Sequence, residues 1–396
     1  MQSDDAPPTV LLRPFARKII EEDLYRFDTA HVLDHVFTVS RQVKTPSLPH
    51  DERDSLLLSA IVKLVRYRDT LVSNTQKLQI HYAYALLYAE DGDYAEATER
   101  LERALAASKN DRLATSYLLL LLGELYQRTF KVFRACDAYS QALNILFDHD
   151  DASHSPIGPA NPHAAASLEL SLLIRLCGIE VELAQYTPAR YHAQLAWRLF
   201  DVVGAELAQL KTRLTWIESQ RQRCIGDLMS SHQNTLKVVE ALHTSPTLSL
   251  PRAYLIASDG ALDLANSTLQ SLASRQQYLD NAKEYSKRAK VAFHGDDDGI
   301  GKHLLELTAC RTEHVERVLT CEGASTRHIE TVVDLAERSK DPALIGRAYT
   351  VLGAEMELAG DREYARLFYG FAEDRLKKYG YISLSEAPAA AFERLR

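Results

Sequence analysis

KLQIHYAYALLYAEDGDYAEATERLERALAAS, at residues 77–108, is followed by LATSYLLLLLGELYQRTFKVFRACDAYSQALNIL, at residues 113–146, and both stretches carry one pattern. An offset of 38 residues superimposes small side chains on small ones and large side chains on large ones. The aligned pairs are Ala97 with Ala135, Leu101 with Tyr139, Ala104 with Ala142 and Tyr88 with Tyr126. Each stretch shows a helical spacing of apolar residues interrupted by one short turn, so each predicts a helical hairpin.

The repeated hairpin predicts a stacked helical solenoid. Small residues such as Ala97 and Ala104 mark where the two helices of a hairpin approach closely, and large ones fill the space between hairpins. One hairpin cannot bury its apolar face alone, so neighbouring copies must stack to form a continuous core. Solenoids of this kind present an extended concave surface that is suited to holding another polypeptide.

Further copies define the organisation of the chain. Clear hairpins recur at residues 170–203 and 346–379, where Gly353 aligns with Gly123 and Tyr369 with Tyr139. Divergent helix pairs are predicted for residues 205–243, 251–293 and 299–338 from apolar periodicity alone. The whole chain is therefore divided into a disordered N-terminus (1–10), an N-terminal helical region (11–72), the solenoid (73–379) and a C-terminal tail (380–396).

Composition limits the class of protein. The 396 residues include only 16 glycines and 13 prolines, and the formal net charge is −8, which argues against a chain-wide nucleic-acid or anionic-membrane surface. Five scattered cysteines without a C-x-x-C spacing argue against a disulfide framework and a zinc site. No signal peptide or membrane-spanning apolar run is visible, so we expect an intracellular, cytoplasmic location.

At these residues the chain resembles the tetratricopeptide repeat (TPR) superfamily. The slots of that family's motif are filled by Leu122-Gly123, Tyr126, Gly92-Asp-Tyr94-x-x-Ala97, Tyr139 and Ala142-Leu143. The resemblance implies an all-α, right-handed superhelix of about seven hairpins, preceded by about three helices without the repeat. It is specific for the fold and carries little information about the ligand.

The same resemblance implies that ligand-facing residues lie on the inner face of each first helix. Carried over slot by slot, the candidates are Gln79, Tyr82, Leu86, Glu90, Tyr117, Leu120, Glu124, Gln127, Arg128, Arg347 and Thr350. Such a mixture of aromatic, aliphatic and forked polar groups suits an extended or helical peptide. The alternative for Tyr82, Leu86 and Leu120 is simple packing against neighbouring hairpins.

Other motifs are better explained by structure than by chemistry. His31 and His35 lie one helical turn apart, but a catalytic zinc needs a third ligand and a base. The segment GDDDGIGK (295–302) resembles a phosphate loop, yet three aspartates would repel a triphosphate and His303 replaces the usual Ser or Thr. Basic residues cluster on two helices, where a solvated face is the ordinary explanation. These are Lys211, Arg213, Arg221 and Arg223 on one helix and Lys283, Lys287, Arg288 and Lys290 on the other.

We therefore expect a non-enzymatic scaffold or adaptor that binds a protein or peptide in the concave groove, with no catalytic residue, metal or cofactor. Nucleic acid and membrane are not expected partners, and a homodimer is a possible assembly. The alternative is a peptide-sensing regulator, since three leading helices followed by seven hairpins is similar in plan to the bacterial Rap-type TPR regulators. In that case residues 11–72 form the effector region, and ligand in the groove switches the output.

Overall fold

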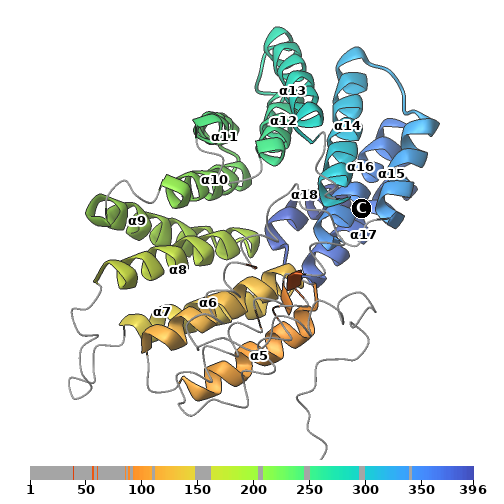
Figure 1. Cartoon of the computed structure of the whole chain (residues 1–396). Coiled ribbons are helices and arrows are strands. Elements are labelled where there is room, and N and C mark those ends of the chain that lie inside the picture. The colour runs from red at the N-terminus through yellow and green to blue at the C-terminus, as the bar shows by residue number, and fades with distance from the viewer. Residues whose placement is uncertain are drawn as a thin grey trace, which may run out of the picture. The chain divides into compact units, whose positions relative to one another are not determined.

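The computed structural model describes residues 92–108, 112–147, 162–203, 208–244, 250–293, 299–338 and 341–396, together with a few isolated positions before them. Within these ranges the chain forms fourteen helices and no strand (Figure 1). Their bounds are α5 Tyr94–Ala107, α6 Arg112–Arg128, α7 Val132–Phe147, α8 Pro162–Glu182, α9 Tyr186–Val203, α10 Ala208–Cys224, α11 Leu228–Thr244, α12 Leu250–Asn266, α13 Leu272–Ala292, α14 Gly299–Thr320, α15 Thr326–Arg338, α16 Pro342–Leu358, α17 Arg362–Lys378 and α18 Ile382–Arg394. The predicted N-terminal helices of residues 11–72 lie outside the described ranges.

The chain divides into two compact units, which are described separately. The first contains residues up to Thr129 together with Asp137–Ala160, and the second contains Phe130–Cys136 and Asn161–Arg396. In the second unit, helix pairs α10–α11, α12–α13 and α14–α15 confirm the three divergent pairs that periodicity predicts. Figure 1 shows these pairs following one another between α8–α9 and α16–α17.

A left-handed residue ends the first helix of a hairpin and sets up the second. At the α16–α17 turn, Gly360 has φ of 80°, and the N–H of Asp361 donates to the carbonyl of Met356 at 2.9 Å while that of Gly360 donates to Glu357 at 3.0 Å. These two bonds form a Schellman motif, which satisfies carbonyls at the end of the helix. The Asp361 carboxylate then caps α17 by accepting from the N–H of Tyr364. The turn therefore reverses the chain within a few residues.

A glycine–tyrosine contact fixes the spacing within two hairpins. A Cβ on Gly353 would lie 2.7 Å from the ring of Tyr369, and Gly123 is covered in the same way by Tyr139. Each tyrosine hydroxyl donates to the residue one turn beyond its glycine, Gln127 at 2.8 Å and Glu357 at 3.1 Å. The two contacts obey the same sequence spacing in the first and the second unit, so the aligned repeat positions have one structural cause.

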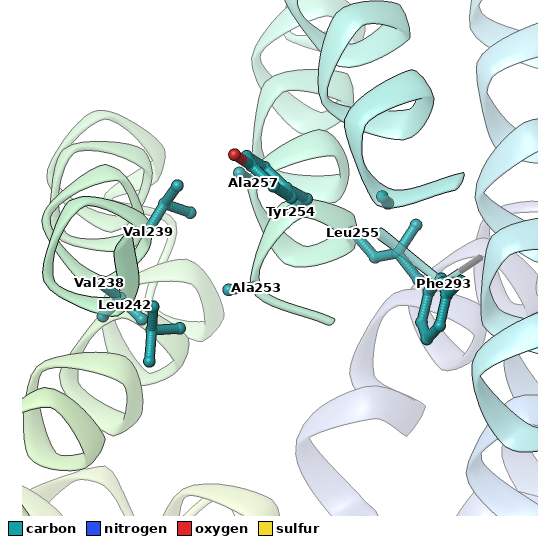
Figure 2. Packing of buried hydrophobic residues seen from close by; sticks show 9 residues of the cluster. Val238, Val239, Leu242, Ala253, Tyr254, Leu255, Ala257 and Phe293 are labelled. Carbon is teal, nitrogen blue, oxygen red and sulfur yellow. The ribbon is translucent and has the colours of Figure 1, made fainter. Parts of the chain in front are cut away.

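Clusters of apolar side chains pack successive hairpins of the second unit against one another. Figure 2 shows one such layer, in which Val238, Val239 and Leu242 of α11 belong to the same cluster as Ala253 and Tyr254 of α12. All five are at most 8% exposed. Because α11 closes one pair and α12 opens the next, this layer is the inter-hairpin packing that a solenoid requires.

The segment that resembles a phosphate loop has a packing role where it is described. Residues Gly299–Lys302 are already the first turn of α14. A Cβ on Gly301 would meet the ring of Phe293, which is buried at the end of α13. Glycine is therefore required at this position by close packing of an aromatic ring.

Candidate functional site

The predicted ligand-facing residues of the first hairpin, Gln79, Tyr82, Leu86 and Glu90, lie outside the described ranges. In α6 of the first unit, Tyr117 is 42% exposed and Arg128 is exposed, whereas Glu124 and Gln127 are half-buried. Leu120 is buried at 7% exposure, so this side chain packs in the interior of its unit as the core interpretation expects.

In the second unit, charged side chains connect the first helices of four successive pairs, which are α10, α12, α14 and α16. Arg311 of α14 donates one terminal nitrogen to Asp259 of α12 and the other to Asp263 at 2.8 Å. Arg347 of α16 pairs with the second oxygen of Asp259, and Arg223 of α10 places Nε 2.5 Å from Asp263. We call these five residues the arginine–aspartate network.

The network is only partly open to solvent. The Asp259 side chain is 5% exposed, while the side chains of Arg311, Arg347 and Arg223 are 19%, 24% and 26% exposed. Buried charges of this kind persist only when they are paired. The network therefore ties α10, α12, α14 and α16 together and leaves the arginine edges partly accessible.

The charges of the network shift the pKa values of its members in different directions. Burial would raise the pKa of Asp259, but Arg311, Arg347 and Arg223 outweigh it and hold the pKa below its usual value. Burial also opposes the charge on Arg223, which Asp263 and Asp259 overcome, so the pKa of Arg223 is raised. The pKa of Arg347 is lowered by burial and by repulsion from Arg311 and Arg223, against the attraction of Asp259. Cationic charge is thus in excess around Arg347.

Two members of this network stand out in the sequence, and three do not. Arg347 is a predicted ligand-facing residue, and Arg223 belongs to a basic cluster that is expected on a solvated face. Asp259, Asp263 and Arg311 lie in the divergent repeats, where no motif marks the slots. A usable signal was present, since two aspartates one turn apart interrupt the otherwise apolar run ASDGALDLA (257–265). Thr350, the other predicted residue of α16, donates its hydroxyl to the carbonyl of Gly346 at 2.9 Å.

A second polar layer lies between α14 and α16. The fully buried Glu355 carboxylate lies 2.6 Å from Nδ1 of His314 and accepts from Arg317 at 2.9 Å. Arg317 is also buried and reaches Glu313 one turn away. This layer joins α14 and α16 through paired polar side chains.

The C-terminal segment folds back onto the second unit as α18. Near its start, the hydroxyl of Tyr186 donates to Glu386 at 3.0 Å, and Ser383 lies close to Cys224 at the end of α10. Near its end, Arg394 donates from both terminal nitrogens to the Glu357 carboxylate of α16, one of them at 2.9 Å. The segment expected as a tail therefore contains a helix that links the first and the last pairs of this unit.

A half-buried carboxyl group, that of Glu182, lies near Tyr381, where α18 begins. Loss of contact with water, together with the nearby charge of Asp341, raises the pKa of Glu182 from about 4.5 to about 7. Burial, and then the Glu182 carboxylate, raise the pKa of the Tyr381 hydroxyl. A carboxyl whose pKa is higher in the folded state favours folding when protonated. This contribution is complete below pH 4.5 and is lost as the pH rises to about 7.

We therefore expect Glu182→Gln to flatten the pH dependence of stability. Above pH 7 the variant should be more stable than the wild type, on the order of 1–3 kcal/mol, and the difference should disappear near pH 4.5. Urea unfolding from pH 4.5 to 8 measures both curves, with the exposed Glu393→Gln as the matched control. Parallel curves for wild type and Glu182→Gln would contradict the burial of this carboxyl group.

No group of three or more His, Cys, Asp or Glu side chains in the described ranges is arranged to hold a metal ion. Within the same part of the chain, every helix is too short or too polar to cross a membrane.

The helix pairs, the hairpin turns and the inter-hairpin core together define a TPR-like α-solenoid. Comparison with solved structures supports this class. The apo form of the quorum sensor NprR from B. thuringiensis matches with a TM-score of 0.58 and 12% identity, over 92% of each chain.

Two further structures have the same fold. Aspartyl phosphate phosphatase F from Bacillus subtilis matches with a TM-score of 0.55 and 14% identity, over 91% of this chain and 88% of its own. The Rap conjugation gene regulator of the plasmid pLS20, in complex with the Phr* peptide, matches with a TM-score of 0.51 and 11% identity, over 90% of this chain and 97% of its own. No protein-family model matches the sequence, and a search of curated proteins finds no related one.

Proposed function

We propose that the protein is a non-catalytic, peptide-binding regulator built on a TPR-like α-solenoid. The observation that carries the proposal is the arginine–aspartate network, which brings partly exposed arginines of α10, α14 and α16 onto two aspartates of α12. Charged side chains that only face solvent on separate helices would not be expected to meet in one cluster. A converging, partly desolvated set of forked donors is suited to fixing the orientation and register of a peptide.

The solved structures support a regulator over a passive scaffold. One protein with this fold is described as a quorum sensor, and another as a gene regulator in complex with a peptide. The likeness extends over about nine tenths of this chain, at 12% identity or less. At such identity the fold is shared and the ligand is not implied, so the function must be argued from the residues of the site.

We further propose that each unit offers ligand contacts on its first helices. In the second unit these are Arg347, through the network, and Thr350, three residues further along α16. In the first unit they are the exposed or half-buried residues of α6, Tyr117, Glu124, Gln127 and Arg128. Residues 11–72 remain the proposed effector region, and the groove residues Gln79, Tyr82, Leu86 and Glu90 remain proposed contacts.

Affinity selection of peptides tests this function directly. Full-length protein is immobilised and exposed to the low-mass fraction of the host's culture, and retained peptides are identified by mass spectrometry. We expect one peptide or a few related ones. The synthetic peptide should then bind with a Kd of about 1 μM or tighter in calorimetry and should increase the hydrogen-exchange protection of α10, α12, α14 and α16.

Two controls make the result decisive. Replacing Arg347 with Gln should weaken binding of that peptide, whereas Arg338→Gln, an exposed arginine on α15, should leave its Kd unchanged. A stable protein partner retained equally with and without peptide, together with no peptide in the selection, would establish the scaffold instead.

The scaffold remains a second candidate because of one surface feature. Tyr364, Leu367 and Phe371 lie one above another on α17 and are 55%, 46% and 47% exposed. Exposed apolar stripes of this kind mark contacts with other proteins or with a second copy of the chain. Co-purification of a partner that is lost in Leu367→Glu would favour this function.

A further inference from the structure

The arginine–aspartate network contains more cationic than anionic groups. Three guanidinium groups face two carboxylates, which leaves one positive charge in a cluster whose side chains are at most 26% exposed. The neighbours that shift the pKa of Arg347 include one carboxylate, Asp259, and two further cations, Arg311 and Arg223. An unbalanced cation in a partly desolvated position is unfavourable, and an arriving anion would relieve it.

The arrangement of the donors shows where that anion would bind. Arg311 uses both terminal nitrogens on the two aspartates, so this guanidinium holds the cluster together. Arg347 uses one terminal nitrogen on Asp259, and Arg223 uses Nε on Asp263. Within the described ranges, the second terminal nitrogen of Arg347 and both terminal nitrogens of Arg223 have no protein partner.

The two aspartates also hold these donors in place. Asp259 and Asp263 lie one turn apart on α12, and each accepts from Arg311 and from one of the other two arginines. Arg223 and Arg347 are therefore each held by one aspartate of the pair that Arg311 joins. Arginine donors that are already ordered lose less side-chain entropy on binding than free ones.

We propose that Arg223 and Arg347 bind a carboxylate group of the peptide ligand, with Arg311, Asp259 and Asp263 as positioning residues. The inference rests on the proposed function and specifies the chemistry of its ligand. A carboxylate has two oxygens in the plane and spacing that a guanidinium fork matches. The carboxylate comes either from the C-terminus of the peptide or from an Asp or Glu side chain, and the experiment distinguishes the two.

Four pools of short random peptides test the proposal on the full-length protein. The pools have either a free or an amidated C-terminus, and they either include or omit Asp and Glu. Peptides retained by the wild type are quantified by mass spectrometry. We expect about 10- to 100-fold enrichment of carboxylate-bearing peptides over the amidated pool without acidic residues, which corresponds to about 1.4–2.8 kcal/mol. Enrichment that needs a free C-terminus identifies that group, and enrichment that persists on amidation identifies a side chain.

Variants locate the effect on the network. Arg223→Gln removes a partly exposed fork, and Arg347→Lys keeps the charge while removing the paired donors, so both should lose the enrichment. Arg338→Gln should retain it, since this arginine pairs with Glu306 and Asp334 away from the network. Circular dichroism checks that each variant is folded. The comparison of the four pools on the wild type does not depend on the variants.

Three outcomes separate this inference from the function on which it rests. Equal retention of all four pools would overturn carboxylate recognition and leave peptide binding intact. Enrichment that is unchanged in Arg223→Gln and Arg347→Lys would place the carboxylate elsewhere and also overturn it. No retention from any pool would contradict the proposed function, and the inference would fall with it.

Discussion

Replacing Asp259 with Ala should lower the free energy of unfolding of the second unit by about 3–5 kcal/mol. The carboxylate is 5% exposed and pairs with Arg311 and Arg347, and its pKa is held below the usual value by three guanidinium groups. Without it, three partly buried cations would share the single charge of Asp263. Removing one partner of a buried ion pair is costly chiefly because the other partner stays buried without compensation.

Urea and thermal unfolding followed by circular dichroism measure this effect. The exposed Asp280→Ala, on α13, is the matched control and should change stability by less than about 0.5 kcal/mol. Asp259→Asn, which keeps the shape of the side chain and one acceptor, should lower the free energy of unfolding by less than Asp259→Ala does.

A group with a lowered pKa stabilises the fold above its unfolded pKa near 3.8, and this contribution decreases as the pH falls below that value. The difference between wild type and variant should therefore shrink in acid, and a loss below about 1 kcal/mol at pH 7 would show that the network is not a structural tie.

The second large effect is expected at Gly353. An added methyl group would lie 2.7 Å from the ring of Tyr369, so Gly353→Ala should destabilise the α16–α17 hairpin by about 1–3 kcal/mol. Helix propensity alone predicts the opposite, because alanine is better than glycine in a helix interior by about 1 kcal/mol. The sign of the effect therefore decides between packing and propensity.

Gly178 supplies the control for this prediction. It also lies inside a first helix, α8, but an added Cβ there would make only ordinary contact with Ile217 at 3.4 Å. Gly178→Ala should be neutral or slightly stabilising. In a double-mutant cycle, Tyr369→Ala should remove the penalty of Gly353→Ala, and additive effects would contradict the proposed clash.

The local rules of the chain could be read from the sequence because they depend on neighbouring residues. Gly353 and Tyr369 repeat the spacing of Gly123 and Tyr139, and the structure confirms one contact at both places. Apolar periodicity also predicted the divergent pairs, such as α12–α13, without any motif. Turns and hairpins follow from residues within a few positions of each other, so the TPR-like α-solenoid was predictable as a class.

Charged contacts between hairpins were not predictable in the same way. Arg311 and Asp259 are separated by 52 residues and Arg347 and Asp259 by 88, and the lengths of the intervening helices decide whether they meet. The slot pattern identified Arg347 as ligand-facing but gave no sign that it is paired with a buried aspartate. Leu120 occupies the slot that corresponds to Thr350 and is buried, because the packing of its own unit covers it.

The repeated hairpin thus follows from local sequence, since helix periodicity, small residues at close approaches and left-handed turns act over short distances. Stacking of the hairpins, in contrast, selects which side chains of distant hairpins come together. It placed Arg223, Asp259, Asp263, Arg311 and Arg347 in one network, and it laid α18 against the first and last helix pairs of the second unit. The physical reason is that stacking fixes the rotation of each hairpin on the next, and charge pairing across that stack depends on the accumulated rotation.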